Sequence, residues 1–129
     1  MVLQDYSALA SQFEAESLDA ASFSHVDHIG VACQMLQRYD FLDAAVRYCR
    51  ALRNIAAKAG APDKFNMTVT LAFLSLLSER MAVTPHSSFA EFLDKNEDLS
   101  SRSLLGSWYS ADRLDSAKAR ETFLMPDRF

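Results

Sequence analysis

The segment MTVTLAFLSLLSERM, residues 67–81, decides the fold of this chain. Its apolar side chains do not keep to one stripe but lie on most sides of a helix: Met67, Val69, Leu71, Phe73, Leu74, Leu76, Leu77 and Met81. A helix of this kind is usually central, because its neighbours must cover several faces. Asn66, directly before the segment, is a preferred N-cap residue. We therefore expect a central helix that begins after Asn66 and is covered by other helices.

Working outward, apolar residues at helical spacing predict further helices over residues 3–15, 24–38, 40–60 and 88–95. Their ends carry capping signals, namely Ser24 with Asp27, Asp40, Ser88 with Glu91, and Gly60 at the C′ position. Pro62 and Pro85 follow two of the predicted helices and prevent their continuation. No segment alternates with period two, so no strand is expected.

The last part of the chain, residues 99–129, predicts two or three short helical pieces, with Ser110 and Ser116 as caps. It is too rich in large apolar groups for a disordered terminus. We expect Trp108 and Phe123 to pack on the bundle, and Arg120 to reach an acidic group or a helix C-terminus. The expected fold class is all-α: a compact bundle of about five helices, with a short irregular helical C-terminal tail packed on it, in one domain over residues 1–129.

Composition narrows the function classes. The chain has 129 residues and a net charge of −4, and cations do not cluster in either half, which disfavours nucleic-acid binding. We see no signal peptide and no apolar run of about 18 residues, so we expect no membrane association and a cytoplasmic location. Cys33 and Cys49 both fall on helical apolar faces, which favours buried free thiols in a reducing compartment over a disulfide.

The only local hint of chemistry is FSHVDHIGVACQML, residues 23–36, which places His25 and His28 three residues apart. At about 100° per residue, both lie on the apolar side of their helix and point into the bundle. Neutral imidazoles in a bundle core can shuttle protons or bind a metal. The commoner alternative is a pair of core histidines bonded to backbone or hydroxyl groups.

A pocket around the pair is the third interpretation. His25 and His28 would be its catalytic candidates, and Tyr48, Asn66 and Thr68 would bind the ligand. A metal site needs more ligands, and the apolar face of residues 40–60 supplies none. We therefore expect no metal and no cofactor.

Helix 40–60 also carries Arg47, Arg50 and Arg53 on its outer side, with Asp43 and Arg47 at i, i+4 spacing for an ion pair. A solvated surface is the simplest interpretation of this face. The alternative is a patch that binds an anion or an acidic protein partner.

Three stretches together resemble a family of small, mostly uncharacterised bacterial all-helical proteins. They are the H-x-x-H stretch at residues 23–36, KFNMTVTLAFL at 64–74, and the tail WYSADRLDSAKARETFLMPD at 108–127. The second motif of that family usually has the form Tyr-His-Glu-Thr-x-Thr. Here Thr68 and Thr70 match, whereas Asn66 and Met67 replace the histidine and the glutamate. The resemblance implies a helical fold and a bacterial, cytoplasmic protein. If the family has a site that combines the two histidine motifs, it also implies that this chain has lost half of that site.

These observations favour a binding or accessory module that holds a small ligand or a partner protein at a depleted polar site around His25 and His28. A small-molecule enzyme that uses the two histidines as acid and base, or as metal ligands, is the alternative. The sequence leaves open whether the chain forms a homo-oligomer.

Overall fold

The computed structural model describes residues 6–101 and 103–128, and this part of the chain contains helices and turns but no strand. The elements in chain order are α1 (Tyr6–Glu14), η1 (Ala20–Ser22), α2 (His25–Arg38), α3 (Phe41–Lys58), η2 (Pro62–Lys64), α4 (Met67–Val83), α5 (Phe89–Lys95), η3 (Glu97–Ser100), η4 (Leu104–Ser107), α6 (Ala111–Leu114) and α7 (Ala117–Glu121), where η marks a 3₁₀ turn. The all-α fold class is confirmed, with five main helices and a short helical tail. Residues 1–5 of the first expected helix lie outside the described residues.

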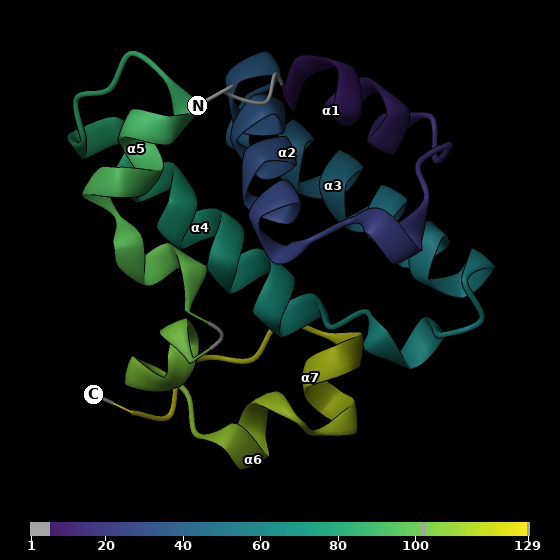
Figure 1. Cartoon of the computed structure of the whole chain (residues 1–129). Coiled ribbons are helices and arrows are strands. Elements are labelled where there is room, and N and C mark those ends of the chain that lie inside the picture. Colours follow the sequence, from purple (N-terminus) through teal and green to yellow (C-terminus); the bar gives the residue numbers. More distant parts are fainter. Residues whose placement is uncertain (1–5, 102, 129) are drawn as a thin grey trace.

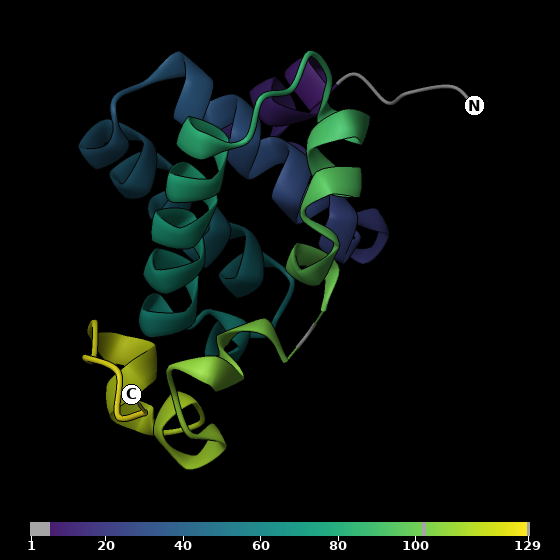
Figure 2. The ribbon, with the colours of Figure 1, turned by 90° about the vertical axis from the view of Figure 1, so that its left-hand side faces the viewer.

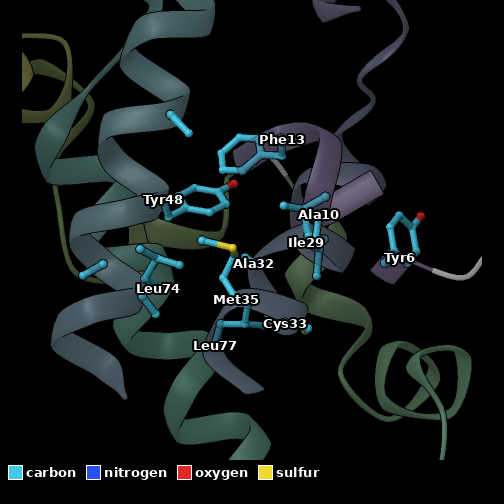
Figure 3. Packing of buried hydrophobic residues seen from close by; sticks show 14 of the residues in the cluster. Tyr6, Ala10, Phe13, Ile29, Ala32, Cys33, Met35, Tyr48, Leu74 and Leu77 are labelled. Carbon is cyan, nitrogen blue, oxygen red and sulfur yellow. The ribbon is translucent and has the colours of Figure 1, made fainter. Parts of the chain in front are cut away.

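The core lies where α1, α2, α3 and α4 meet (Figures 1 and 3). Phe13, Ile29, Met35, Leu74 and Leu77 are fully buried there. Helix α4 contacts α2 and α3 on one side and the tail on another, which is the central position that its apolar sequence predicts.

Local end signals explain why the helices begin and end where they do. The N-cap side chain of each α-helix from α2 to α7 accepts a hydrogen bond from a backbone N–H three residues on; these residues are Ser24, Asp40, Asn66, Ser88, Ser110 and Ser116. Helix α3 ends in a Schellman motif: Gly60 has a φ of 77°, its N–H donates to the Ala57 carbonyl, and the N–H of Ala61 donates to the Ala56 carbonyl.

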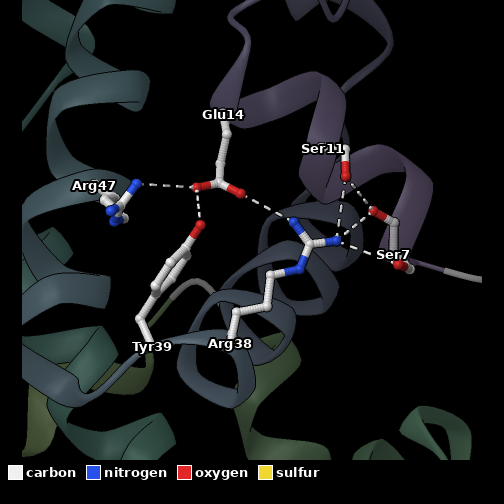
Figure 4. A network of polar contacts seen from close by, with 6 residues as sticks. All are labelled: Ser7, Ser11, Glu14, Arg38, Tyr39 and Arg47. Atoms are coloured by element: carbon white, nitrogen blue, oxygen red, sulfur yellow. Dashed lines mark hydrogen bonds and ion pairs between the residues drawn. The ribbon is translucent and has the colours of Figure 1, made fainter.

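A polar cluster joins α1 to the α2–α3 connection (Figure 4). Glu14 accepts hydrogen bonds from Arg38 at 2.9 Å and from the Tyr39 hydroxyl at 2.7 Å. The Arg47 guanidinium lies 3.8 Å from the same carboxylate and 4.2 Å above the Tyr39 ring. The expected Asp43–Arg47 pair is therefore wrong, because Arg47 turns toward the more enclosed carboxylate that tertiary packing brings to it.

The tail packs beside the N-terminal half of α4, at the end of the molecule opposite α1 and α5 (Figures 1 and 2). Tyr109 and Ala119 are buried, and the Tyr109 hydroxyl donates to the Leu124 carbonyl at 2.8 Å. Trp108 and Phe123, which we expected to be the packed groups, remain 40% and 44% exposed. Arg120 donates to the Asp115 carbonyl at the C-cap of α6, so its expected contact with a helix C-terminus is confirmed.

Candidate functional site

The first turn of α2 positions both histidines, and a capping box holds that turn rigidly. The Ser24 hydroxyl accepts from the Asp27 N–H, and the Asp27 carboxylate accepts from the Ser24 N–H, both at 3.1 Å. The other carboxylate oxygen of Asp27 accepts from the Tyr6 hydroxyl at 3.0 Å, which ties the turn to α1.

His25 points toward the tail side of the bundle. Its Nε2 lies 3.2 Å from the Leu99 carbonyl oxygen, and its ring centroid is 6.2 Å from that of Phe73. It lines a cavity of about 380 Å³ between α2, α4 and the η4–α6 region, and Tyr109 and Arg128 are also among the lining residues.

His28 points in another direction, toward α3 and η1. Its ring centroid lies 4.1 Å from that of Phe23, and its Nδ1 is 3.4 Å from the Tyr48 hydroxyl. That hydroxyl is also 3.4 Å from the His28 carbonyl oxygen. His28 lines a second cavity, of about 430 Å³, which does not include His25.

The polar residues that we expected to line one common pocket therefore do not lie together. The Asn66 side chain accepts from the Val69 N–H at 3.0 Å and donates to the Leu114 carbonyl at 2.7 Å. The Thr68 hydroxyl donates to the Thr122 carbonyl at 2.6 Å and accepts from the Leu124 N–H at 3.0 Å. Among the expected site residues, the structure brings together only His28 and Tyr48, while Asn66 and Thr68 hold the tail.

Electrostatics keep His28 neutral. Burial, and next the charge of His25, lower the pKa of His28 to about 4, against the opposing effect of the Asp27 carboxylate. Burial also raises the pKa of the Tyr48 hydroxyl above its usual range, so both partners of this contact are uncharged at neutral pH. An imidazole with this pKa is a poor acid–base catalyst near pH 7, because proton transfer is most effective when the pKa lies near the working pH.

Neither cysteine has the surroundings of a nucleophile. Cys33 and Cys49 are buried and free. Burial raises the pKa of the Cys33 thiol to about 12 and that of the Cys49 thiol to about 11, whereas a reactive thiol needs a lowered pKa and access to solvent. Within residues 6–101 and 103–128, no group of three or more His, Cys, Asp and Glu residues is placed to hold a metal ion.

The walls of the His28 cavity explain why it exists. They consist of Phe23, Leu52, Ile55 and Phe65, together with five alanines at positions 20, 21, 56, 59 and 61 and one cation, Lys64. The alanine methyl groups leave open the space that larger side chains would fill. Sequence reasoning missed these residues, although the clusters DAA at 19–21 and AAKAGA at 56–61 were visible signals.

One ring nitrogen of His28 is not used for hydrogen bonding within the described part of the chain. His28 Nε2 has no hydrogen-bond partner among the described residues, where every fully buried side-chain nitrogen or oxygen has one. Nε2 is therefore not fully buried, and His28 is one of the residues that line the cavity. A larger cavity of about 470 Å³ lies between α2 and α5 and has His86 on its wall with the same pattern: Nδ1 contacts the Thr84 carbonyl at 2.8 Å, and Nε2 has no hydrogen-bond partner among the described residues. The walls of that cavity are more polar, because Gln34, Gln37, Ser87 and Ser88 line it.

Comparisons with protein-family models, with curated proteins and with solved structures found no match to this chain. None of the helices in the described part combines the length and the apolar character that crossing a membrane requires. The geometry of the cavities thus carries the functional argument.

Proposed function

We propose that this protein is a binding module that holds a small molecule in the His28 cavity. The observation that carries the proposal is an apolar cavity of about 430 Å³ that is lined by His28, whose Nε2 has no hydrogen-bond partner among the described residues. Ligand sites in proteins have volumes of about 300–1,000 Å³ and combine apolar walls with a few polar groups that orient the ligand.

Rigid surroundings support this role. Phe23 covers one side of the His28 ring, the capping box fixes its helical turn, and Tyr48 contacts its Nδ1. A preformed site loses less ordering entropy when a ligand binds than a flexible one does. A neutral imidazole can hydrogen-bond to a ligand without the cost of burying a charge.

A matched pair of variants tests the proposal. Ala56 lines the cavity, whereas its neighbour Ala57 is exposed and does not. A library of small organic molecules would be screened by two-dimensional NMR against the wild type, Ala56→Phe and Ala57→Phe. We expect ligands that shift the signals of His28 and Phe65 to bind the wild type and Ala57→Phe but not Ala56→Phe.

Two results would contradict the proposal. One is a screen in which no molecule shifts the signals of the cavity residues. The other is a set of ligands that bind Ala56→Phe as tightly as the wild type, with both variants folded by circular dichroism, because such ligands would occupy another part of the surface.

A further inference from the structure

The charge on the wall of the His28 cavity is positive. Lys64 is the only charged residue on its wall, and this side chain is exposed and has no ion pair among the described residues. Its neighbour Asp63 does not line the cavity. The other cation at this end of α3, Lys58, lies 3.1 Å from the Glu16 carboxylate and is already paired.

The other residues on the wall of the cavity carry no charge that could bind a charged group of a ligand. Phe23, Leu52, Ile55 and Phe65 present apolar surface, and the neutral His28 offers one hydrogen-bonding nitrogen. A ligand that fits these walls has an apolar body, and its charge lies at the edge of the cavity, where Lys64 is exposed. A single ammonium group suits a single negative charge, whereas a diphosphate needs several donors.

We propose that the His28 cavity takes an amphiphilic organic acid, whose apolar chain or ring lies between Phe23, Leu52 and Phe65 and whose carboxylate meets the Lys64 ammonium group and accepts a hydrogen bond from His28 Nε2. This inference rests on the proposed binding function and adds the class of ligand. Lys64 then discriminates by charge, and the alanine-lined walls discriminate by size.

The test uses three probes that share an eight-carbon chain and differ in charge: octanoate, octanamide and octylammonium. Affinities for the full chain would be measured by calorimetry, and the His28 signal in NMR spectra would report occupancy of the cavity. We expect octanoate to bind about three- to fivefold more tightly than octanamide, the contribution of one exposed ion pair. Octylammonium should bind most weakly, because its charge repels Lys64.

Chain length gives a second readout. Each buried methylene group contributes roughly fourfold in affinity, so hexanoate should bind up to about 15-fold more weakly than octanoate. Bound octanoate should also raise the pKa of His28, since a nearby negative charge favours the imidazolium, whereas octanamide should not.

Two variants isolate the charge. Lys64→Met keeps an unbranched apolar side chain like the stem of lysine and removes the ammonium group, so it should lower octanoate affinity to that of octanamide and leave octanamide unchanged. Lys118→Met is the control, because Lys118 is exposed on α7, lines none of the cavities described above and has no ion pair among the described residues. It should change neither affinity.

The outcomes separate the two proposals. If library molecules bind in the cavity but octanoate has no advantage over octanamide, or keeps its advantage in Lys64→Met, the ligand class is wrong and the binding function stands. Octanoate that still binds Ala56→Phe occupies another site, which also overturns the inference. If neither the library nor any probe shifts the His28 signal, both proposals fail.

Discussion

His28 should make the stability of this protein depend on pH. Its pKa is about 4 in the folded chain, because burial and the neighbouring His25 charge disfavour the imidazolium. In an unfolded chain the pKa of a histidine is about 6.5. Between these two values the unfolded chain binds a proton that the folded chain does not, so the free energy of unfolding must rise with pH in this window.

The size of the effect follows from the two pKa values. The contribution of the neutral imidazole is complete above about pH 6.5 and is lost as the pH falls toward 4. About 2 kcal/mol should be lost between pH 7 and pH 5, and about 3 kcal/mol over the whole window. Such a loss is a substantial part of the roughly 5–15 kcal/mol that stabilises an ordinary domain.

The carboxylates change the free energy of unfolding at lower pH, so their effect can be separated from that of His28. The Arg80 guanidinium lowers the pKa of Asp98, and hydrogen bonds from Ser110 lower the pKa of Asp127. Stability from a carboxylate with a lowered pKa is present above its unfolded value of about 4 and is lost as the pH falls below it. Measurements above pH 5 therefore contain little contribution from these carboxylates.

The assay is urea unfolding of the wild type, His28→Gln and His86→Gln at pH 5, 6, 7 and 8. We expect the wild type and His86→Gln to lose about 2 kcal/mol more than His28→Gln between pH 7 and pH 5. The comparison uses the change in the free energy of unfolding with pH, so a substitution that lowers stability equally at every pH does not affect it. If His28→Gln keeps the wild-type slope, the electrostatic description of His28 is refuted.

Three further predictions concern packing and thiol chemistry. Asn66→Ala should lower the free energy of unfolding by about 1–2 kcal/mol in urea titrations, because it removes both the cap and the bond to the Leu114 carbonyl. Asn66→Asp keeps the cap and should therefore lose less stability. Gly30→Ala should cost about 1–3 kcal/mol in the same assay, because the added Cβ would lie 2.5 Å from the Tyr6 ring; a variant with wild-type stability would show that the ring moves freely. Both cysteines should react with a disulfide reagent only when urea unfolds the chain, and fast labelling of the native protein would contradict their burial and raised pKa values.

The helix ends were predictable because their causes are local. A cap needs only a suitable side chain and the backbone three residues on, so Ser24, Asp40, Asn66 and Ser88 could be recognised without knowledge of the fold. The same holds for Gly60, whose positive φ follows from its place after the last helical turn. The 3₁₀ turns η1, η2 and η3 were missed, because segments of three or four residues carry no periodic signal, whereas the short helical pieces expected in the tail correspond to η4, α6 and α7.

Long-range packing could not be derived from helical phase alone. Phe41 falls on the apolar side of α3 by periodicity but is 43% exposed, because it lies at the first position of the helix. Arg47 lies near Glu14 and over Tyr39, two residues outside its own helix. The first partner depends on how α1 packs against α3 and the second on the course of the α2–α3 connection, and the spacing of apolar residues determines neither.

The histidine pair shows the same limit within the candidate site. Periodicity correctly predicts that both imidazoles lie on the side of α2 that faces the bundle. His25 contacts a backbone carbonyl and His28 contacts a hydroxyl group, as expected of core histidines. The two directions differ by about 60° around the helix axis. That angle is enough for His25 to face the tail and for His28 to face α3, so spacing along the chain did not imply a shared pocket.

Polar residues near a histidine are weak evidence for a site in this chain, because tail packing already uses the side chains of Asn66 and Thr68. The His28 cavity arises instead from small side chains at the end of α3 and in η1, where Ala56 and Ala59 leave space that leucines would close. Larger apolar side chains at these positions would bury more apolar surface, which would add to stability. Stability alone therefore does not explain why small side chains line the cavity beside His28.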